Sequence, residues 1–171
     1  MKNRIIFIII SISLICAFVI FYKGLSKSNS YEPKSKIKDI PEFTTTTFFE
    51  NKKVNSKNIF NRNKFYLLNI WSSWCLPCRE EHALLLNLGK NKKLVIIGLN
   101  YKDNSKNAEH FISELGNPYK KILVDRDGTK AIEWGAFGVP ESFLIYENKI
   151  IKKFTGPLNT SSVREIEKII R

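Results

Sequence analysis

Two cysteines separated by two residues, Cys75 and Cys78, constrain this chain more than any other feature. They follow an unbroken apolar run at 65–71, which has the pattern of a strand buried on both faces. Residues 79–88 then carry leucines at helical spacing. A Cys-x-x-Cys turn between a buried strand and a helix is typical of a dithiol redox site. The unpaired N–H groups and the dipole at the helix N-terminus favour the thiolate of the first cysteine, which is the form that attacks disulfides.

Other uses of a Cys-x-x-Cys pair fit the sequence less well. A structural zinc site needs two further ligands, and the sequence contains no second Cys-x-x-Cys. His82 follows Cys78 by four residues and is in reach of a metal site, although a structural histidine on a helix face is the favoured interpretation. Covalent haem attachment requires a histidine directly after the second cysteine, where this chain has Arg79. We therefore predict disulfide exchange, and we expect neither a metal nor a cofactor.

The length and charge of the chain limit its class further. A chain of 171 residues allows one domain of ordinary size plus a tail or an anchor. The formal net charge of +12 raises the question of nucleic-acid binding. The lysines, however, are scattered through every segment without a basic cluster interleaved with aromatics, so we expect no nucleic-acid partner. A positive surface also suits the neighbourhood of an anionic membrane.

The N-terminal segment is predicted to be a membrane anchor. Residues 5–22 are apolar apart from two serines, which is long enough to cross the hydrocarbon layer of a bilayer. A cleaved signal peptide, the alternative, needs small residues at a cut site, and none is well placed. The third cysteine, Cys16, follows the bulky Ile15, which makes a poor lipoprotein site. We assign residues 1–22 to the anchor, and the lysines on both of its sides leave its orientation undecided by charge.

The rest of the chain reads as a tether and one domain. Residues 23–40 are polar and rich in serine and lysine, as in a flexible tether, and 41–171 form the domain. Residues 51–63 read as a polar connection. The predicted strands cover 43–48, 65–71, 94–99, 122–125, 142–146 and 150–154, and the predicted helices cover 79–88, 107–115 and 161–171, the last capped by Thr160 or Ser161. This order predicts an α/β fold with a mixed sheet flanked by helices.

Four stretches, in the same order along the chain, resemble one family: 69–82, 98–103, 116–119 and 135–143. The resemblance covers about 43–156 and is to the membrane-anchored thioredoxin-like reductases of cytochrome c maturation, the CcmG or DsbE type. It implies a thioredoxin-like fold on an N-terminal transmembrane helix in the inner membrane, with the domain in the periplasm. The implied partners are apocytochrome c or a CcmH-type thiol protein, and a DsbD- or CcdA-type electron donor.

The resemblance also implies roles for residues outside the cysteine pair. Pro140 resembles the proline that such proteins hold in cis beside the thiols, and an ordinary loop proline is the alternative. It would aim the Val139 backbone at an incoming peptide, which adds as a strand. Trp74 is expected to shield the disulfide and contact substrate. Tyr101 and Asp103 are expected to border the groove.

Two acids are candidates for proton transfer to the second cysteine. Asn69 stands on the strand where many thioredoxins place a buried acid, and asparagine does not titrate. The proton transfer must then involve another group or water, and the resemblance points to Glu81 and Glu141. For Glu81 the alternative is a first-turn acid favoured by the helix dipole. A carboxylate near Cys75 would also raise the pKa of its thiol.

These observations favour a thiol–disulfide oxidoreductase that acts as a reductant in cytochrome c biogenesis. The Cys75 thiolate attacks a substrate disulfide, and Cys78 resolves the mixed disulfide. A reductase with other clients is the nearest alternative. A thioredoxin-fold module that holds apocytochrome without turnover is a more distant one, and the intact cysteine pair argues against it.

Overall fold

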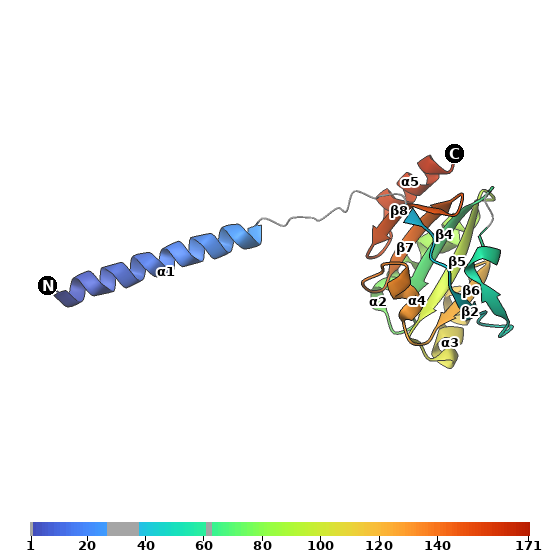
Figure 1. The fold of residues 1–171 in the computed structure, drawn as a ribbon, viewed down its shortest axis with the longest axis horizontal. Helices are drawn as coiled ribbons and strands as arrows, with labels where there is room; N and C mark the ends of the chain where they lie inside the picture. Colours follow the sequence, from blue (N-terminus) through green and yellow to red (C-terminus); the bar gives the residue numbers. More distant parts are fainter. Residues whose placement is uncertain (1, 27–37, 61–62) are drawn as a thin grey trace. The chain divides into compact units, whose positions relative to one another are not determined.

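The computed structural model describes residues 2–26, 38–60 and 63–171, which fall into two compact units (Figure 1). The first unit contains a single described helix, α1 (Lys2–Ser26), and the second begins at Ser35. The stretch Arg4–Tyr22 of α1 is long and apolar enough to cross a membrane, and among the described residues it is the only helix of which this is true. Most of the predicted tether, 27–37, lies outside the described residues.

The second unit is built on a six-stranded sheet in the order β1-β8-β7-β4-β5-β6. Strand β4 is parallel to β5, and β5 to β6, whereas β7 is antiparallel to β4 and to β8, and β1 is antiparallel to β8. The bounds are β1 (Lys38–Asp39), β4 (Phe65–Trp71), β5 (Leu94–Tyr101), β6 (Lys121–Asp125), β7 (Glu141–Tyr146) and β8 (Lys149–Thr155), with a separate antiparallel pair β2 (Thr44–Thr46) and β3 (Lys53–Asn55). The predicted mixed sheet is confirmed.

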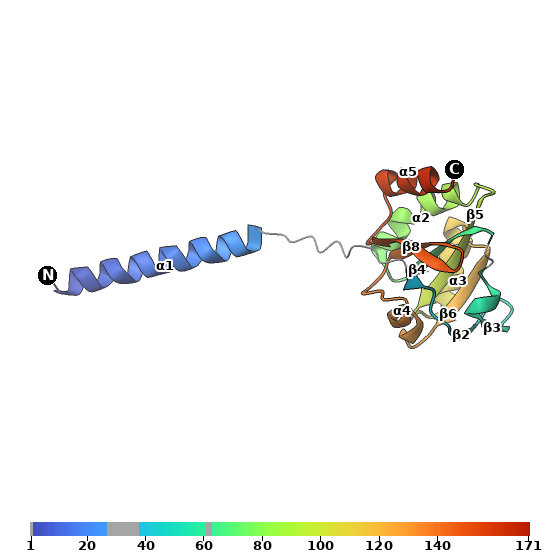
Figure 2. The ribbon, with the colours of Figure 1, turned by 45° about the horizontal axis from the view of Figure 1, so that its top comes forward.

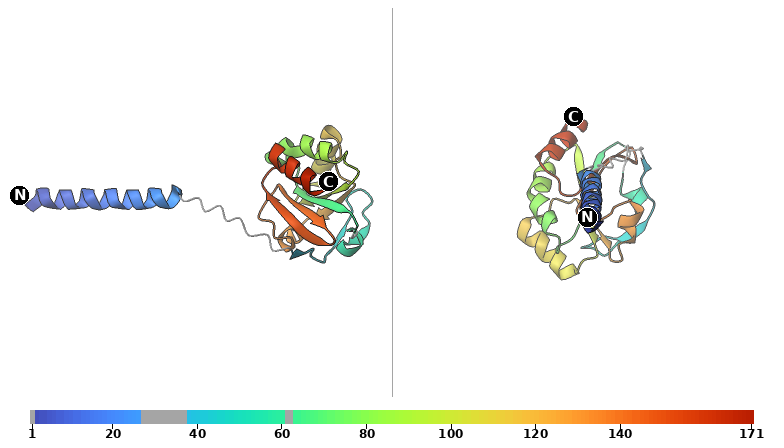
Figure 3. Two further views of the ribbon diagram at one scale, coloured as in Figure 1. Left: turned by 90° about the horizontal axis from the view of Figure 1, so that it is seen from above. Right: turned by 90° about the vertical axis from the view of Figure 1, so that its left-hand side faces the viewer.

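Helices cover both faces of this sheet, as the end-on view shows (Figure 3). On one face lie α2 (Leu76–Leu88), α3 (Ser105–Leu115) and α5 (Thr160–Ile169), and α5 lies beside α2 (Figure 2). On the other face lie α4 (Thr129–Glu133), the β2–β3 pair and the short 3₁₀ helix η1 (Ser56–Asn58). Each face has its own apolar core, because successive β4 side chains alternate between them: Leu67 packs in the first cluster and Leu68 in the second.

The elements missed at the sequence level are short and polar. Strand β3 lies inside the stretch 51–63 that was predicted to be a connection, and β1 lies inside the predicted tether. Neither carries a strand pattern of its own, because each is defined by its pairing with a distant segment. The cap of α5 is Asn159, whose side chain accepts from the N–H groups of Ser161 and Ser162, so the prediction of Thr160 or Ser161 was wrong by one or two residues.

Strand register brings three loops to one edge of the sheet. Trp71, the last residue of β4, pairs with Asn100 near the end of β5. Ile70 pairs with Glu141, the first residue of the antiparallel β7. The turn after β4, the loop after β5 and the loop before β7 therefore start from the same edge, and the two cysteines follow the first of these segments.

Gly98 lies in a closely packed region beneath this edge of the sheet. A Cβ atom at Gly98 would lie 2.8 Å from Trp71 Nε1 and 3.0 Å from Tyr119 Cγ, both in buried side chains. We expect Gly98→Ala to lower the free energy of unfolding by about 1–3 kcal/mol, because neither ring has room to move. Chemical denaturation of the oxidised protein measures this. Gly138→Ala is the control, since nothing lies within 4 Å of a Cβ there, and an equal loss in both variants would contradict the packing argument.

Candidate active site

The two cysteines are joined by a disulfide at the start of α2, with their Cα atoms 5.3 Å apart. Cys75 is the N-cap residue, with extended backbone, and its Sγ accepts the N–H of Cys78 at 3.1 Å. Pro77 occupies the second helical position, where the missing N–H removes no helical hydrogen bond. The local sequence therefore places the first sulfur against the open N–H groups of the helix, as predicted.

Both cysteines are covered in this oxidised form. Cys75 is 5% exposed and Cys78 is 1% exposed, so Cys75 is the more accessible of the two but is not an open surface residue. Both belong to the apolar cluster between the sheet and α2. When the pair is reduced, the Cys75 thiolate is favoured by the helix N-terminus, whose first turn carries Arg79 and no acid. Its place at the helix N-terminus therefore favours Cys75 over the more deeply buried Cys78 as the attacking thiol.

The Val139–Pro140 peptide bond is cis, as predicted. Pro140 is buried, directly before β7, and Val139 packs against the cluster that contains both cysteines. The register of β7 with β4 brings this loop to the edge that carries the cysteine turn. The predicted cis bond is thus confirmed, and its loop starts from the same edge of the sheet as the cysteine turn.

A buried polar network lies under α2, one turn from the second cysteine. Glu81 is 1% exposed; its Oε1 accepts from Asn69 Nδ2 at 2.8 Å, and its Oε2 accepts from the N–H of Leu158 at 2.6 Å. Asn69 also donates to Ser142 Oγ at 3.0 Å, and its Oδ1 accepts from the hydroxyl of Tyr119 at 2.8 Å. Asn69, which replaces the expected acid on β4, thus holds an acid that comes from α2.

Burial governs the protonation of this network. It raises the pKa of Glu81 from 4.5 to about 7, although the bonds from Leu158 and Asn69 oppose the shift. Burial, together with the charge of Glu81, also raises the pKa of Tyr119 well above its usual value, which keeps the phenol protonated. Glu81 can therefore take up or release a proton near neutral pH, and Glu81 and Cys78 lie one turn apart on the buried face of α2.

Glu141, the other candidate acid, has a different environment. It is buried, its Oε1 accepts from the N–H of Phe137 at 3.0 Å, and its Oε2 lies 2.7 Å from Lys153 Nζ. Its neighbour Ser142 is the residue that reaches the Asn69 network, and adjacent strand residues point to opposite faces. The structure therefore separates the two acids: Glu81 lies on the α2 side of the sheet, and Glu141 holds the loop before the cis proline.

The two aromatic candidates differ in position. Trp74 is 60% exposed, directly before Cys75, and its indole N–H donates to the carbonyl of Lys102 at 3.1 Å. Tyr101 packs in the second apolar cluster, where its ring lies against Gly128. The cysteines belong to the first cluster, so the structure does not bring the Tyr101 ring together with them.

Exposed apolar side chains missed by the sequence reasoning lie beside the site. Leu76, directly after Cys75, is 67% exposed, and Phe137, in the loop before the cis proline, is 91% exposed. The ammonium group of Lys153 lies 4.4 Å from the centre of the Phe137 ring. Leu76 is the first residue of α2 and Phe137 lies in a loop, so neither belonged to a periodic pattern, and their exposure became visible only in the fold.

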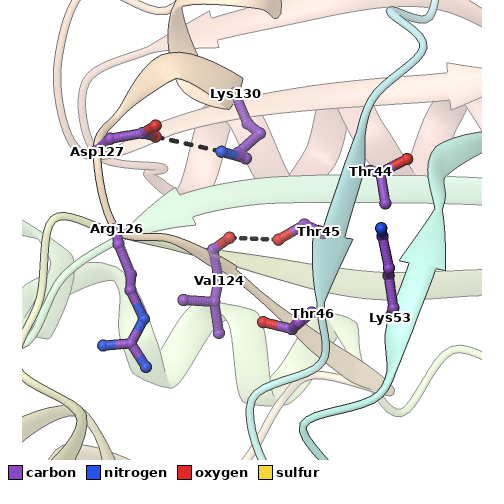
Figure 4. Close-up of a pocket in the computed structure, with 8 residues that line it drawn as sticks. All are labelled: Thr44, Thr45, Thr46, Lys53, Val124, Arg126, Asp127 and Lys130. Atoms are coloured by element: carbon purple, nitrogen blue, oxygen red, sulfur yellow. Dashed lines mark hydrogen bonds and ion pairs between the residues drawn. The ribbon is translucent and has the colours of Figure 1, made fainter.

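The hollows among the described residues include one beside the cysteine turn and one elsewhere on the domain. One, of about 200 Å³, lies next to the cysteine turn and is lined by Ser73, Trp74, Arg79, Asn107, His110 and Phe111. The other, of about 320 Å³, is lined by Thr44, Thr45, Thr46, Lys53, Val124, Arg126, Asp127 and Lys130 (Figure 4). In the second hollow the Lys130 ammonium lies 3.2 Å from Asp127, and the Thr45 hydroxyl donates to the Val124 carbonyl. It shares no residue with the thiol site.

His82, the histidine considered as a possible metal ligand, has a structural environment in the fold. Within the described ranges, no group of three or more histidine, cysteine, aspartate or glutamate side chains is arranged to hold a metal ion. His82 is buried, with its Nε2 2.9 Å from the carbonyl of Gly116 and its ring against Phe111 and Tyr119. Burial lowers the pKa of this imidazole, so it packs as a neutral structural residue.

Sequence comparison identifies relatives over most of the chain. The thiol:disulfide interchange protein DsbE of Vibrio cholerae is 35% identical over 172 residues, which cover 96% of this chain and 92% of the relative. DsbE of Escherichia coli is 32% identical over 165 residues, with 93% and 89% covered. The thiol:disulfide interchange protein CycY of Rhizobium leguminosarum is 47% identical over 105 residues, which cover 61% of this chain and 56% of the relative.

Structural comparison agrees on the fold. The crystal structure of a DsbE-like protein from Chlorobium tepidum superposes with a TM-score of 0.67 at 21% identity, over 80% of this chain and 95% of that one. The Redoxin family matches residues 36–170 of this chain, which include every strand and helix of the second unit. The chain therefore belongs to the Redoxin family, and its Cys75–Cys78 pair makes it a thiol–disulfide oxidoreductase.

Proposed function

We propose that this chain is a membrane-anchored periplasmic reductant of cytochrome c biogenesis. Its substrate would be the disulfide of an apocytochrome c haem-attachment site, or of the CcmH-type thiol protein that acts with it. The observation that carries the proposal is the Cys75–Cys78 pair at a helix N-terminus beside a cis proline. The DsbE relatives, similar over nearly the whole chain, add support.

The reaction begins with the reduced dithiol. The Cys75 thiolate attacks one sulfur of the substrate disulfide, which forms a Cys75–substrate disulfide and releases the other substrate sulfur as a thiolate. That thiolate takes a proton from water. The incoming peptide would pair with the Val139 backbone as an added strand, and the exposed Trp74 and Phe137 would supply apolar contacts.

The second step returns the protein to the disulfide form. Cys78 loses its thiol proton and attacks the Cys75 sulfur, which forms the Cys75–Cys78 disulfide and releases the second substrate thiolate. Two electrons pass from the protein dithiol to the substrate disulfide. A transmembrane thiol carrier of the DsbD or CcdA type would then reduce the protein again.

We assign the proton acceptance in this step to Glu81. A useful base has a pKa near the working pH, and burial brings the pKa of Glu81 to about 7. Its place one helical turn from Cys78, on the same buried face, supports the assignment. Glu141 takes a supporting role in this proposal, because its bond to the Phe137 N–H orients the loop that leads to Pro140.

The proposed membrane anchor is helix α1. The apolar stretch Arg4–Tyr22 would anchor the chain in the inner membrane, and the second unit would lie on the periplasmic side. This location supplies disulfide substrates, because the periplasm is oxidising. A reductase with other periplasmic clients is the second candidate, since the Cys-x-x-Cys site does not specify the protein that carries the substrate disulfide.

Trapping identifies the client. In a Cys16→Ser background, Cys78→Ser should stall the reaction after the first step, because the mixed disulfide through Cys75 then lacks its resolving thiol. Non-reducing electrophoresis and mass spectrometry of cells that express this variant should show an adduct with apocytochrome c or its thiol partner. The matched Cys75→Ser variant should show none. Adducts only with unrelated envelope proteins, in cells that mature cytochromes c normally without this gene, would exclude the cytochrome role and leave the reductase.

The raised pKa of Glu81 predicts a pH-dependent stability. The folded protein holds this proton more tightly than the unfolded chain, so the stabilising contribution is complete below pH 4.5 and is lost as the pH rises to about 7. The loss is about 3 kcal/mol over this window. Glu81→Gln should remove that part of the slope in urea titrations between pH 4.5 and 7.5. The exposed neighbour Glu80→Gln is the control and should retain the wild-type slope.

The same pair of variants tests the catalytic assignment. Glu81→Gln should slow the second step about 10²-fold or more at pH 7, because the Cys78 proton then has no acceptor. Stopped-flow reaction with an excess of a peptide disulfide separates the two steps, and the first step should keep its rate. Unchanged resolution in Glu81→Gln would show that water or another group takes the proton.

The anchor is tested by fractionation. The uncleaved apolar stretch predicts that full-length protein stays in the membrane fraction after a carbonate wash. Protease added to spheroplasts should digest the second unit, because the proposal places it outside the cytoplasm. A soluble product trimmed near residue 22 would identify the segment as a signal peptide.

A further inference from the structure

We propose that Asp103 is a positioning residue of the thiol site, which fixes the turn that carries Cys75. Asp103 lies in the loop after β5, 30 residues from its main partner, Ser73. Its carboxylate does not touch either cysteine in the described contacts. It acts on the reaction through the backbone that precedes Cys75, whichever protein is the client.

Three donors converge on this carboxylate. The backbone N–H of Ser73 donates to Oδ2 at 2.6 Å, and the Ser73 hydroxyl donates to Oδ1 at 2.7 Å. The side-chain amide of Asn100, which is buried on β5, donates to Oδ2 at 2.9 Å. Hydrogen bonds to an ionised acceptor are shorter and stronger than those between neutral groups. The carboxylate therefore ties the turn after β4 directly to the end of β5.

The residues on either side of Ser73 also form hydrogen bonds to the end of β5 and the loop after it. The Ser72 hydroxyl donates to the carbonyl of Tyr101, and the Trp74 indole N–H donates to the carbonyl of Lys102. Each of the three residues before Cys75 thus donates either to the last residue of β5 or to the loop that follows it. Only the Asp103 contact binds a backbone N–H of the turn, so it fixes the path of the main chain rather than the place of a side chain.

The loop itself is held at both ends. Lys102 has a positive φ of 44°, and its N–H donates to the carbonyl of Asp125 on β6 at 2.9 Å. Directly after Asp103, Asn104 caps α3 by accepting from the N–H groups of Lys106 and Asn107. Strand β6 and helix α3 both hold the loop in place. Asp103 is therefore itself fixed, and its hydrogen bonds fix the turn before Cys75.

The contact between Asp103 and the turn matters most for reactivity when the Cys75–Cys78 disulfide is reduced. In the oxidised form the covalent bond to Cys78 holds the Cys75 sulfur against α2. In the reduced form and in the mixed disulfide that bond is absent, and the turn is held by its contacts with the loop. The Asp103 contact should therefore keep the Cys75 thiolate in line with an incoming disulfide. It should also stabilise the oxidised form more than the reduced one, because a turn that the disulfide already orders loses less entropy when the contact forms.

Two consequences separate positioning from a simple charge effect. A carboxylate that acted only by its charge would raise the pKa of the Cys75 thiol, and removing it would lower that pKa without changing the reactivity of the thiolate. A positioning residue changes the reactivity of the thiolate itself, since a displaced nucleophile reacts more slowly even when fully ionised. It also changes the equilibrium between the reduced and oxidised forms.

The experiment compares Asp103→Ala and Asp103→Asn in the full-length protein, with Asp39→Asn on the edge strand β1 as the matched control. Iodoacetamide labelling of the reduced protein across pH gives the pKa of Cys75. The rate with oxidised glutathione above that pKa gives the plateau reactivity. We expect Asp103→Ala to lower the plateau about tenfold or more. Asp103→Asn should fall between it and wild type, because the amide keeps one acceptor oxygen.

Equilibration with glutathione supplies the second measurement. Asp103→Ala should shift the equilibrium toward the dithiol about tenfold, which is about 30 mV toward a less negative potential. Ser73→Ala should give a smaller shift in the same direction. When Ser73→Ala is added to Asp103→Ala, it should shift the glutathione equilibrium less than it does in the wild-type protein, because the two residues share a contact. Ser73→Ala and Asp103→Asn keep the test available if Asp103→Ala does not fold.

The opposite results are equally definite. If both Asp103 variants lower the Cys75 pKa alike, leave the plateau unchanged and shift the glutathione equilibrium only as far as that change in pKa accounts for, Asp103 acts by charge and the proposal is wrong. It is also wrong if the Asp103 variants match Asp39→Asn in all three measurements. Neither result would affect the proposed cytochrome role, which the trapping experiment tests separately.

Discussion

The register of β4 against β5 and β7 is the constraint on which the thiol site depends. The pairing of Trp71 with Asn100, and of Ile70 with Glu141, brings the cysteine turn, the loop after β5 and the cis-proline loop to one edge of the sheet. A slip of one residue would turn every β4 side chain to the opposite face, and Asn69 would then leave the network under α2. Apolar cores on both faces make that slip costly, so the hydrophobic packing of the domain also sets the geometry of its chemistry.

The same packing gives the two buried acids of the site different surroundings. Glu81 is buried on the α2 side without a cation among its described partners, so desolvation dominates and its pKa rises to about 7. Glu141 is buried on the other face with the Lys153 ammonium 2.7 Å away, which offsets the cost of burying a charge. The fold thus buries one acid without a counter-charge, one helical turn from Cys78, and pairs the other with a lysine at the loop before the cis proline.

Much of the fold and part of the site could be predicted because their signals are local. Strand β4 was predicted at 65–71 and observed there, since burial on both faces leaves a continuous apolar run. The hairpin β7–β8 and the helices α2 and α3 were found within a few residues of their bounds. The strands β1 and β3 and the five-residue α4 were missed, because short polar segments have no period of their own and form only against a distant partner. The cis bond before Pro140 was predicted by family resemblance and not by any local rule.

The sequence by itself determined the reaction: the spacing of Cys75 and Cys78, and their place between a buried strand and a helix, are properties of a few consecutive residues. It did not determine which groups surround the thiols. Only the tertiary structure showed that Glu81 contacts Asn69 and that Asp103 contacts the turn before Cys75. It also showed that the ring of Tyr101 packs in the second apolar cluster. Those contacts join residues far apart in the chain, and the pairing of strands, rather than local sequence, decides which of them meet.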